Sequence, residues 1–262
     1  MNWGRAKNLC LIFLVLLNIF LFVMINVSAL RYKLDNDSRK TILNLLEQNN
    51  IKCNKIIESF RPKQKLVLSK FDFDKNKIAK IFFGKNFTFD NNIIETPGKV
   101  LEFTDNGFEL DISEKYYEKL DLLVKKIKEP QANFILDTKI NNDSTQTFIY
   151  RQKYHSFIIE DNFIKFELKK GYIKKITYEY KQAENFFGPS YEIVSPDIIL
   201  FKFIKSDEVV KENEVVIDKF DFIYRTTSEN FGLSFSVPCY RLIYNNDSEI
   251  VFDAYLGEIS ND

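Results

Sequence analysis

The most regular pattern in the sequence is an unbroken apolar segment near its start. Between positions 9 and 27 the only polar side chains are Asn18 and Asn26, with Cys10 as a weakly polar one. This length matches the ~20 residues that a helix needs to cross a bilayer core, whereas the apolar region of a secretory signal is shorter. Small residues before Ala29 would suit cleavage there, but length favours a retained transmembrane helix.

The charges around this segment do not fix its orientation. Arg5 and Lys7 precede it, and further basic residues follow it closely. The rest of the chain has no second apolar span, and large domains translocate largely regardless of their charge. We therefore expect a short cytoplasmic head (1–8), a transmembrane signal anchor in the cell membrane (9–30) and an extracytoplasmic C-terminal region.

Asn18 lies near the middle of the apolar segment, where its carboxamide needs a hydrogen-bond partner. Interhelical bonds of this kind are worth roughly 1–2 kcal/mol or less. Either Asn18 bonds to the backbone of its own helix, or it marks a face that docks on another helix. At helical spacing its side of the helix is shared by Leu11, Leu14, Val15, Leu21, Phe22 and Ile25. Spacing alone leaves the two alternatives level.

The remaining chain alternates between helical and strand-like patterns. Helices are predicted over 38–48, with Ser38 as N-cap; over 74–84, with Asp74 as N-cap and Gly84 at the end; over 113–130, with Ser113 as N-cap and Pro130 just after; and over 195–205, with Ser195 as N-cap and Pro196 at the first position. Strands are predicted at 65–73, around the Asn106-Gly107 hairpin, on both sides of Gly171, and in a closing hairpin joined through 245–247.

These patterns indicate an α+β fold in which antiparallel sheets are each packed with helices. The segment DTKINNDSTQ, residues 137–146, is the most polar connector. We take it as the boundary between two extracytoplasmic lobes, residues 31–144 and 145–262.

Composition gives little sign of chemistry. The 37 basic and 37 acidic residues balance, so no surface for nucleic acid is indicated. His155 is the only histidine, and neither a Walker loop, a dinucleotide fingerprint nor a nucleophile elbow occurs. An acidic dyad remains open, but we expect no enzyme, no cofactor and no metal. Cys53 and Cys239 are expected to be free thiols in the core rather than a disulfide.

The opening MNWGRAKNLCLIFLVLLNIFLF resembles the start of the YycI (WalI) proteins. The matching residues are Trp3, Arg5, Ala6, Lys7, Leu17, Asn18 and Phe20. Weaker similarity follows in ILNLLEQNNIK, in YRQKYHSFIIEDNFIKFELKKGYIKKITYEY and in YRLIYNNDSEIVFDAYLGEI, where Asp253, Ala254 and Gly257 stand in for the family's closing turn. The segment YHSFII lacks the Gly and Pro usual in the family. The resemblance covers nearly the whole chain, but only its N-terminal motif is distinctive.

The resemblance implies a single-pass membrane protein of Gram-positive bacteria with tandem PepSY-like or YycH-like units outside the cell. It implies that a WalK-like sensor histidine kinase and a YycH-like protein are its partners in the lipid bilayer, in a cell-wall-controlling two-component system. It also favours docking for the Asn18 face. The implied contact residues are Trp3, Arg5, Lys7, Leu11, Leu14, Asn18, Phe22 and Ile25. The alternative is an anchored envelope enzyme or a PepSY-like protease inhibitor.

Overall fold

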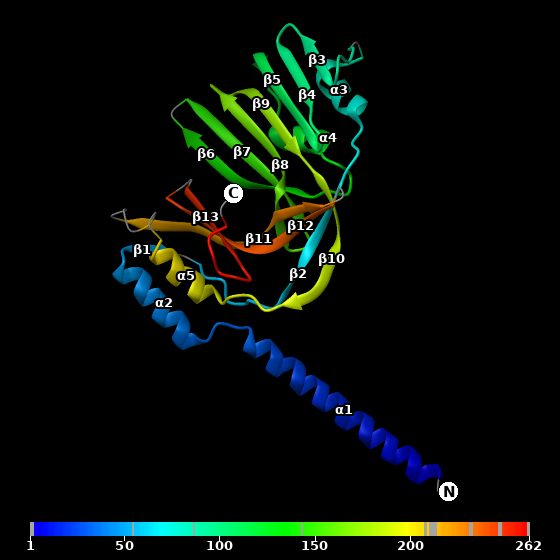
Figure 1. Cartoon of the computed structure of the whole chain (residues 1–262), viewed down its shortest axis with the longest axis vertical. Coiled ribbons are helices and arrows are strands. Elements are labelled where there is room, and N and C mark those ends of the chain that lie inside the picture. Colours follow the sequence, from blue (N-terminus) through cyan, green and yellow to red (C-terminus); the bar gives the residue numbers. More distant parts are fainter. Residues whose placement is uncertain are drawn as a thin grey trace.

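A long helix, α1 (Trp3–Arg31), leads into a folded body in the computed structural model (Figure 1). The structure describes residues 3–53, 55–85, 87–142, 144–206, 209, 214–230, 233–245 and 248–260. The body, residues 32–260, is α+β. Hydrogen bonds link its thirteen described strands into one continuous sheet, which is shared by two packed lobes.

The lobe farther from α1, here the distal lobe, has an antiparallel sheet of order β6-β7-β8-β9-β5-β4-β3. Two helices, α3 and α4, pack on one face of this sheet over a single hydrophobic core (Figure 1). Its elements are α3 (Lys75–Phe83), β3 (Ile93–Thr96), β4 (Lys99–Phe103), β5 (Gly107–Tyr116), α4 (Leu120–Ile127), β6 (Phe134–Asn142), β7 (Thr145–Tyr154), β8 (Phe157–Lys169) and β9 (Tyr172–Glu179).

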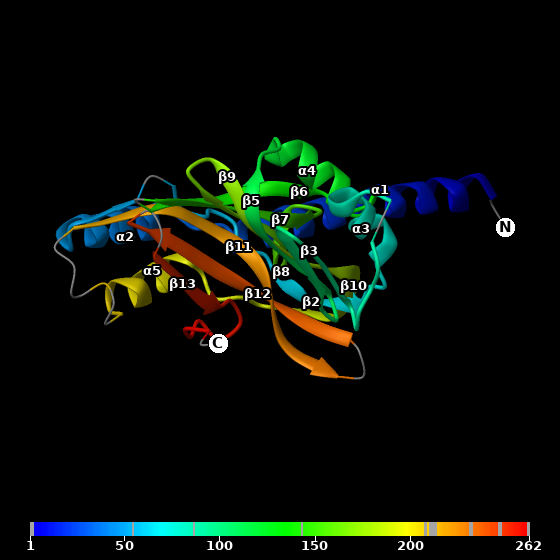
Figure 2. The same ribbon diagram turned by 90° about the horizontal axis from the view of Figure 1, so that it is seen from above.

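The lobe next to α1, here the basal lobe, is built from both ends of the body. Its sheet follows the order β10-β2-β12-β11, with β13 on β12 and β1 parallel to β11. Helices α2 and α5 lie together beside this sheet (Figure 2). Its elements are α2 (Asn36–Gln48), β1 (Ile51–Cys53), β2 (Lys63–Lys70), β10 (Lys181–Tyr191), α5 (Pro196–Ile204), β11 (Val215–Asn230), β12 (Leu233–Tyr244) and β13 (Ser248–Asp253).

The two lobes do not follow the division that the sequence suggested. The distal core is formed by side chains between Phe73 and Tyr180, and the segments before and after it together form the basal core. The connector around residue 144 is the turn of a hairpin, because β6 and β7 pair from Phe134 with Gln152 to Asn142 with Thr145. The polar residues there mark a solvent-facing turn within a lobe.

Several predicted elements agree with the structure. Helix α3 begins after Asp74, whose side chain accepts a hydrogen bond from the Lys77 backbone N–H at 3.0 Å. Strands β8 and β9 turn through Lys170 and Gly171, which both have positive φ, 53° and 80°. The closing hairpin is β12 with β13, although residues 246 and 247 of its turn lie outside the described part of the chain.

Other predictions are corrected. Ser113 does not cap a helix, because residues 113–116 extend β5 and Tyr116 pairs with Ile173. The Ser113 N–H donates to the Gly98 carbonyl and Lys174 Nζ donates to the Ser113 carbonyl, both at 2.9 Å, so contacts with distant parts of the sheet override the helical periodicity of this stretch. Helix α4 therefore starts only at Leu120. The cap of α2 is Asp35 rather than Ser38, since the Asp35 carboxylate accepts from two backbone N–H groups of the first turn.

Gly107 serves a purpose different from the expected one. The Asn-Gly pair suggested a turn with positive φ, but neither Asn106 nor Gly107 has positive φ. Instead β9 passes so close that a Cβ on Gly107 would lie 1.7 Å from the Tyr178 carbonyl oxygen. Glycine is required here because a neighbouring backbone approaches closely.

Candidate functional site: the apolar helix, its root and the interlobe contacts

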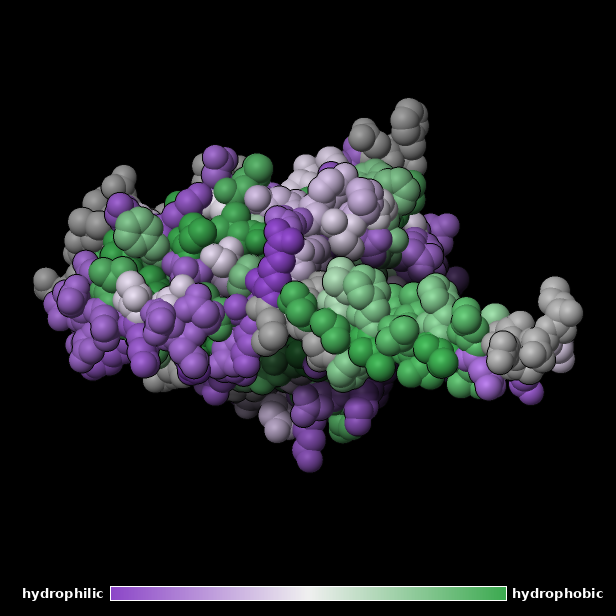
Figure 3. All heavy atoms as spheres, turned by 90° about the horizontal axis from the view of Figure 1, so that it is seen from below, coloured by the Kyte–Doolittle hydropathy of each residue, from purple (hydrophilic) through white to green (hydrophobic). Residues whose placement is uncertain are grey.

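Helix α1 contains the one described segment that is long and apolar enough to cross a membrane, Lys7–Ile25. None of that segment is buried against the body, so its apolar side chains all remain exposed. Figure 3 shows α1 as a largely hydrophobic rod that projects from a surface containing many hydrophilic side chains. A helix that is apolar all round is stable only when protein or lipid surrounds it.

The structure places most of the predicted contact residues on one side of α1. Leu11, Leu14, Asn18, Phe22 and Ile25 recur at intervals of three or four residues and are exposed. We call these five residues the α1 face. Of the three predicted residues in the head, Trp3 and Lys7 are also exposed on the helix, and the Arg5 side chain lies outside the described part.

The Asn18 carboxamide is bonded to its own helix. Asn18 Nδ2 donates to the Leu14 carbonyl oxygen at 2.9 Å. This contact is what one of the two sequence-based alternatives predicted. A carboxamide carries two N–H donors and an acceptor oxygen, so one bond to the backbone leaves capacity for a second helix.

The root of α1 is joined to the basal lobe by a small set of polar contacts. Arg31 Nη2 lies 3.6 Å from Glu192 Oε1, and the Tyr32 hydroxyl donates to the same oxygen at 3.2 Å. The backbone is fixed as well, because Phe60 N–H donates to the Tyr32 carbonyl and Leu34 N–H to the Glu58 carbonyl, at 3.0 and 2.9 Å. A displacement of α1 would therefore also displace the residues that lead into β2 and α5.

A partly buried cluster of charged side chains joins the two lobes. Asp137 on β6 of the distal lobe accepts two hydrogen bonds from Arg241 on β12 of the basal lobe, at 2.7 and 2.9 Å. Both side chains are 0% exposed. Lys219 and Arg151 also contact the Asp137 carboxylate, and Asp221 holds the other side of the Arg241 guanidinium. We call these five residues the interlobe charge cluster.

The electrostatics of this cluster favour the charged forms. Burial alone would raise the pKa of Asp137, but hydrogen bonds from Arg241 and Lys219 and their positive charges lower it far below its ordinary value. The pKa of Arg241 is raised by its bonds to Asp137 and Asp221, against the opposing effect of burial. The cluster is a fixed ionic contact rather than a proton donor or acceptor at neutral pH.

A second acidic group near the junction behaves differently. Glu160 on β8 is largely buried, and this burial raises its pKa to about 7, while Arg225 partly offsets the shift. Glu160 Oε2 lies 3.2 Å from Arg225 Nε but makes no hydrogen bond of good geometry. Repulsion from Glu249 adds to the upward shift. The protonation of Glu160 is therefore sensitive to pH close to neutrality.

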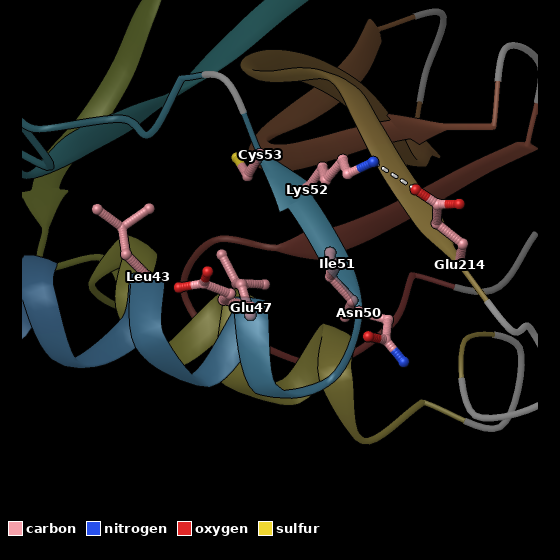
Figure 4. A pocket seen from close by; sticks show the side chains of 8 residues that line it. Leu43, Glu47, Asn50, Ile51, Lys52, Cys53 and Glu214 are labelled. Carbon is pink, nitrogen blue, oxygen red and sulfur yellow. Dashed lines mark hydrogen bonds and ion pairs between the residues drawn. The ribbon is translucent and has the colours of Figure 1, made fainter.

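Two hollows accompany these contacts. An interlobe cleft of about 740 Å³ has aromatic walls, and its lining includes Phe157, Phe220 and Phe222 with Lys55 and Lys153. A second hollow of about 780 Å³ lies between α2 and β1 (Figure 4).

The α2–β1 hollow does not bring reactive groups together. Lys52 on β1 and Glu214, just before β11, point toward each other and form an ion pair at 2.5 Å, as Figure 4 shows. Cys53, the last residue of β1, is half-buried and donates to the Lys55 carbonyl at 3.4 Å. Burial raises the pKa of the Cys53 thiol, which makes it a poor nucleophile.

The groups that could have suggested catalysis or metal binding are scattered. His155 lies in an exposed turn with a φ of 51°, and the centre of its ring lies 4.5 Å from the centre of the Tyr154 ring. Cys53 and Cys239 are free thiols in the structure. Among the described residues there is no group of three or more His, Cys, Asp or Glu side chains placed to hold a metal ion.

Fold and site together define a two-lobed α+β protein that carries an N-terminal helix of membrane-spanning length and an ionic contact between its lobes. A crystal structure of an uncharacterized protein from Eubacterium rectale is similar to it. Its TM-score is 0.51 at 14% identity, covering 81% of this chain and 89% of that chain. This likeness concerns the fold alone.

The Bacillus megaterium YpeB C-terminal domain has a TM-score of 0.39 at 10% identity, covering 88% of this chain and 97% of that domain. No family model matches the sequence, and no curated protein matches it either.

Proposed function

We propose that this protein is a membrane-anchored accessory regulator of a sensor histidine kinase that acts by protein–protein contact. The observation that carries the proposal is α1. It is apolar along a membrane-spanning length, is unburied by its own body and has a polar Asn18 at its centre. The resemblance of the N-terminal motif to YycI proteins supports a kinase of the WalK type as the partner, with a YycH-like protein beside it.

In this proposal the α1 face packs on a transmembrane helix of the kinase. Helices in lipid associate through close packing and interhelical hydrogen bonds, since lipid tails are as apolar as the side chains they replace. The Asn18 carboxamide supplies the polar contact, and Phe22 and the leucines supply the packing. The head with Trp3 and Lys7 stays cytoplasmic, where a basic side chain is favoured.

The body serves as the extracytoplasmic regulatory part and performs no catalysis. At the root of α1, Arg31 and Tyr32 contact Glu192, and these contacts couple the position of the body to the position of α1. Any partner or ligand that binds the body differently in two arrangements would then shift the kinase between its states.

Co-purification from membranes tests the proposal. The tagged full chain should capture a sensor histidine kinase, and the variant Asn18→Leu with Phe22→Leu should capture less of it. The loss of a hydrogen bond and of close packing costs about 0.6–2 kcal/mol, or roughly a 3- to 30-fold weaker association.

The matched control is Phe13→Leu with Phe20→Leu, which changes two phenylalanines on the opposite side of α1 and should leave capture unchanged. Equal capture by both double variants would refute a role for the α1 face. Capture of a peptidase in place of a kinase would favour the anchored inhibitor instead.

A further inference from the structure

Strand β10 is an open edge of the sheet that carries exposed aromatic side chains. It ends the strand order and, among the described strands, pairs only with β2. Phe187 is 61% exposed and Tyr191 is 50% exposed. Exposed apolar edge strands are a liability that proteins usually cover. The exposed parts of these two rings are available for contact with something outside the body.

This edge adjoins the root of α1. Tyr191 directly precedes Glu192, whose carboxylate holds both Arg31 and Tyr32. Phe187 is four residues further along the strand, which is at most about 13 Å at ~3.3 Å per residue. The inference rests on the proposed function in one respect, that α1 crosses a membrane. Residue 31 then lies about 9 Å beyond Ile25, the last residue of the apolar segment, at ~1.5 Å per helical residue, and the edge lies beside that point.

The side chains around the edge have the composition of a membrane interface. Phe187 pairs in register with Lys65, and Tyr191 pairs with Lys63, both on β2. Lys65 is exposed, whereas Lys63 is half-buried and its Nζ lies 4.4 Å from the centre of the Phe157 ring. Aromatic rings favour the headgroup layer, where an apolar body and a polar rim are both satisfied, and an exposed lysine such as Lys65 reaches from there to anionic headgroups.

We infer that the β10 edge rests on the bilayer, with Phe187 and Tyr191 in the interfacial layer of a membrane containing anionic lipids. The basal lobe then has a fixed orientation on the membrane instead of hanging from a free tether. The distal lobe is held away from the lipid by this contact, where soluble or membrane-bound partners can reach it.

Tryptophan fluorescence of the full chain in vesicles tests this inference. Trp3 is the only tryptophan, so Trp3→Phe gives a silent background. Into it we would place Phe187→Trp, Tyr191→Trp as a second reporter, and Leu122→Trp as the control. Leu122 is 49% exposed on α4 of the distal lobe, far along the chain from the root of α1. The vesicles contain phosphatidylcholine and phosphatidylglycerol, with or without bromine on their acyl chains.

The tryptophans at 187 and 191 should emit at shorter wavelength and lose more than half of their intensity in brominated vesicles, while the tryptophan at 122 keeps its intensity. Near-UV circular dichroism checks that each variant is folded. Variants that float with the vesicles but show no more quenching at 187 and 191 than at 122 overturn the inference and leave the anchor intact. Failure of the folded chain to float with vesicles overturns the anchor, and the inference with it.

Discussion

Replacement of Asp137 by Ala should strongly destabilise the contact between the lobes. The side chains of Asp137 and Arg241 are fully buried, and Asp137 is the distal lobe's acceptor for the two Arg241 hydrogen bonds at 2.7 and 2.9 Å. Without it, Asp221 is the one acidic partner of Arg241 left among the described residues. Breaking a buried pair by removal of one partner costs about 3–5 kcal/mol, which is a large part of a typical stability of ~5–15 kcal/mol.

Urea unfolding of the full chain in detergent, followed by near-UV circular dichroism of the tyrosines, measures this change without interference from the helical signal of α1. The double variant Asp137→Leu with Arg241→Met removes the two fully buried charges and should recover part of the lost stability, since apolar replacement of a buried pair is often neutral or better, while Arg151 and Lys219 still lack Asp137. The control Lys52→Met breaks an exposed ion pair and should change little.

The same residue gives a signed pH dependence. The pKa of Asp137 is lowered in the folded protein, so its contribution is present above the ordinary pKa of a carboxyl and is lost as the pH falls through the lower, folded value. Asp137→Asn should remove this part of the acid sensitivity. A cost near zero for Asp137→Ala, or no recovery in the double variant, would refute the view that the interlobe charge cluster joins the lobes.

Three further predictions concern the body. The pKa of Glu160 is raised to about 7 by burial, so its contribution to stability is full below about pH 4.5 and is lost as the pH rises through 7. Glu160→Gln should remove this pH-dependent part of the free energy of unfolding, which is at most about 3 kcal/mol. An unchanged pH dependence of the urea midpoint in this variant would contradict the burial of Glu160. Gly107→Ala should cost about 1–3 kcal/mol or more by overpacking against Tyr178, and a wild-type urea midpoint would show that β9 lies farther away. In a thiol-reagent assay at pH 8, Cys53 should react slowly and Cys239, whose pKa is raised to about 12 by burial, only on unfolding; rapid reaction of Cys239 in the native protein would refute its burial.

The elements that local patterns predicted well are those with a local cause. The Asp74 cap, the Lys170-Gly171 turn and the apolar helix depend on neighbouring residues, so the sequence is enough to predict them. The stretch from Ser113 to Tyr116 has helical spacing, yet it joins β5 because β9 offers hydrogen-bond partners that lie some sixty residues away. The periodicity of a segment depends on its own residues, so it does not reveal a hydrogen-bond partner that is distant in the sequence.

The interlobe charge cluster was missed for a similar reason. Asp137 stands in the most polar stretch of the chain, and Arg241 is a single basic residue in an apolar strand. The one signal in the sequence was that unusual arginine, flanked by Tyr240 and Leu242, because a charge in a buried strand requires a partner. The division into lobes failed because the distal lobe is inserted between two segments of the basal lobe.

Photo-crosslinking from within α1 tests the central claim most directly. A photoreactive residue is placed at Leu14, Asn18 or Phe22 on the α1 face, and at Phe13, Leu16 or Phe20 on the opposite side, in the full chain in its native membranes. The account predicts a product with a sensor histidine kinase from the first three positions and much less from the other three. No kinase product, or equal yields around the helix, would contradict it.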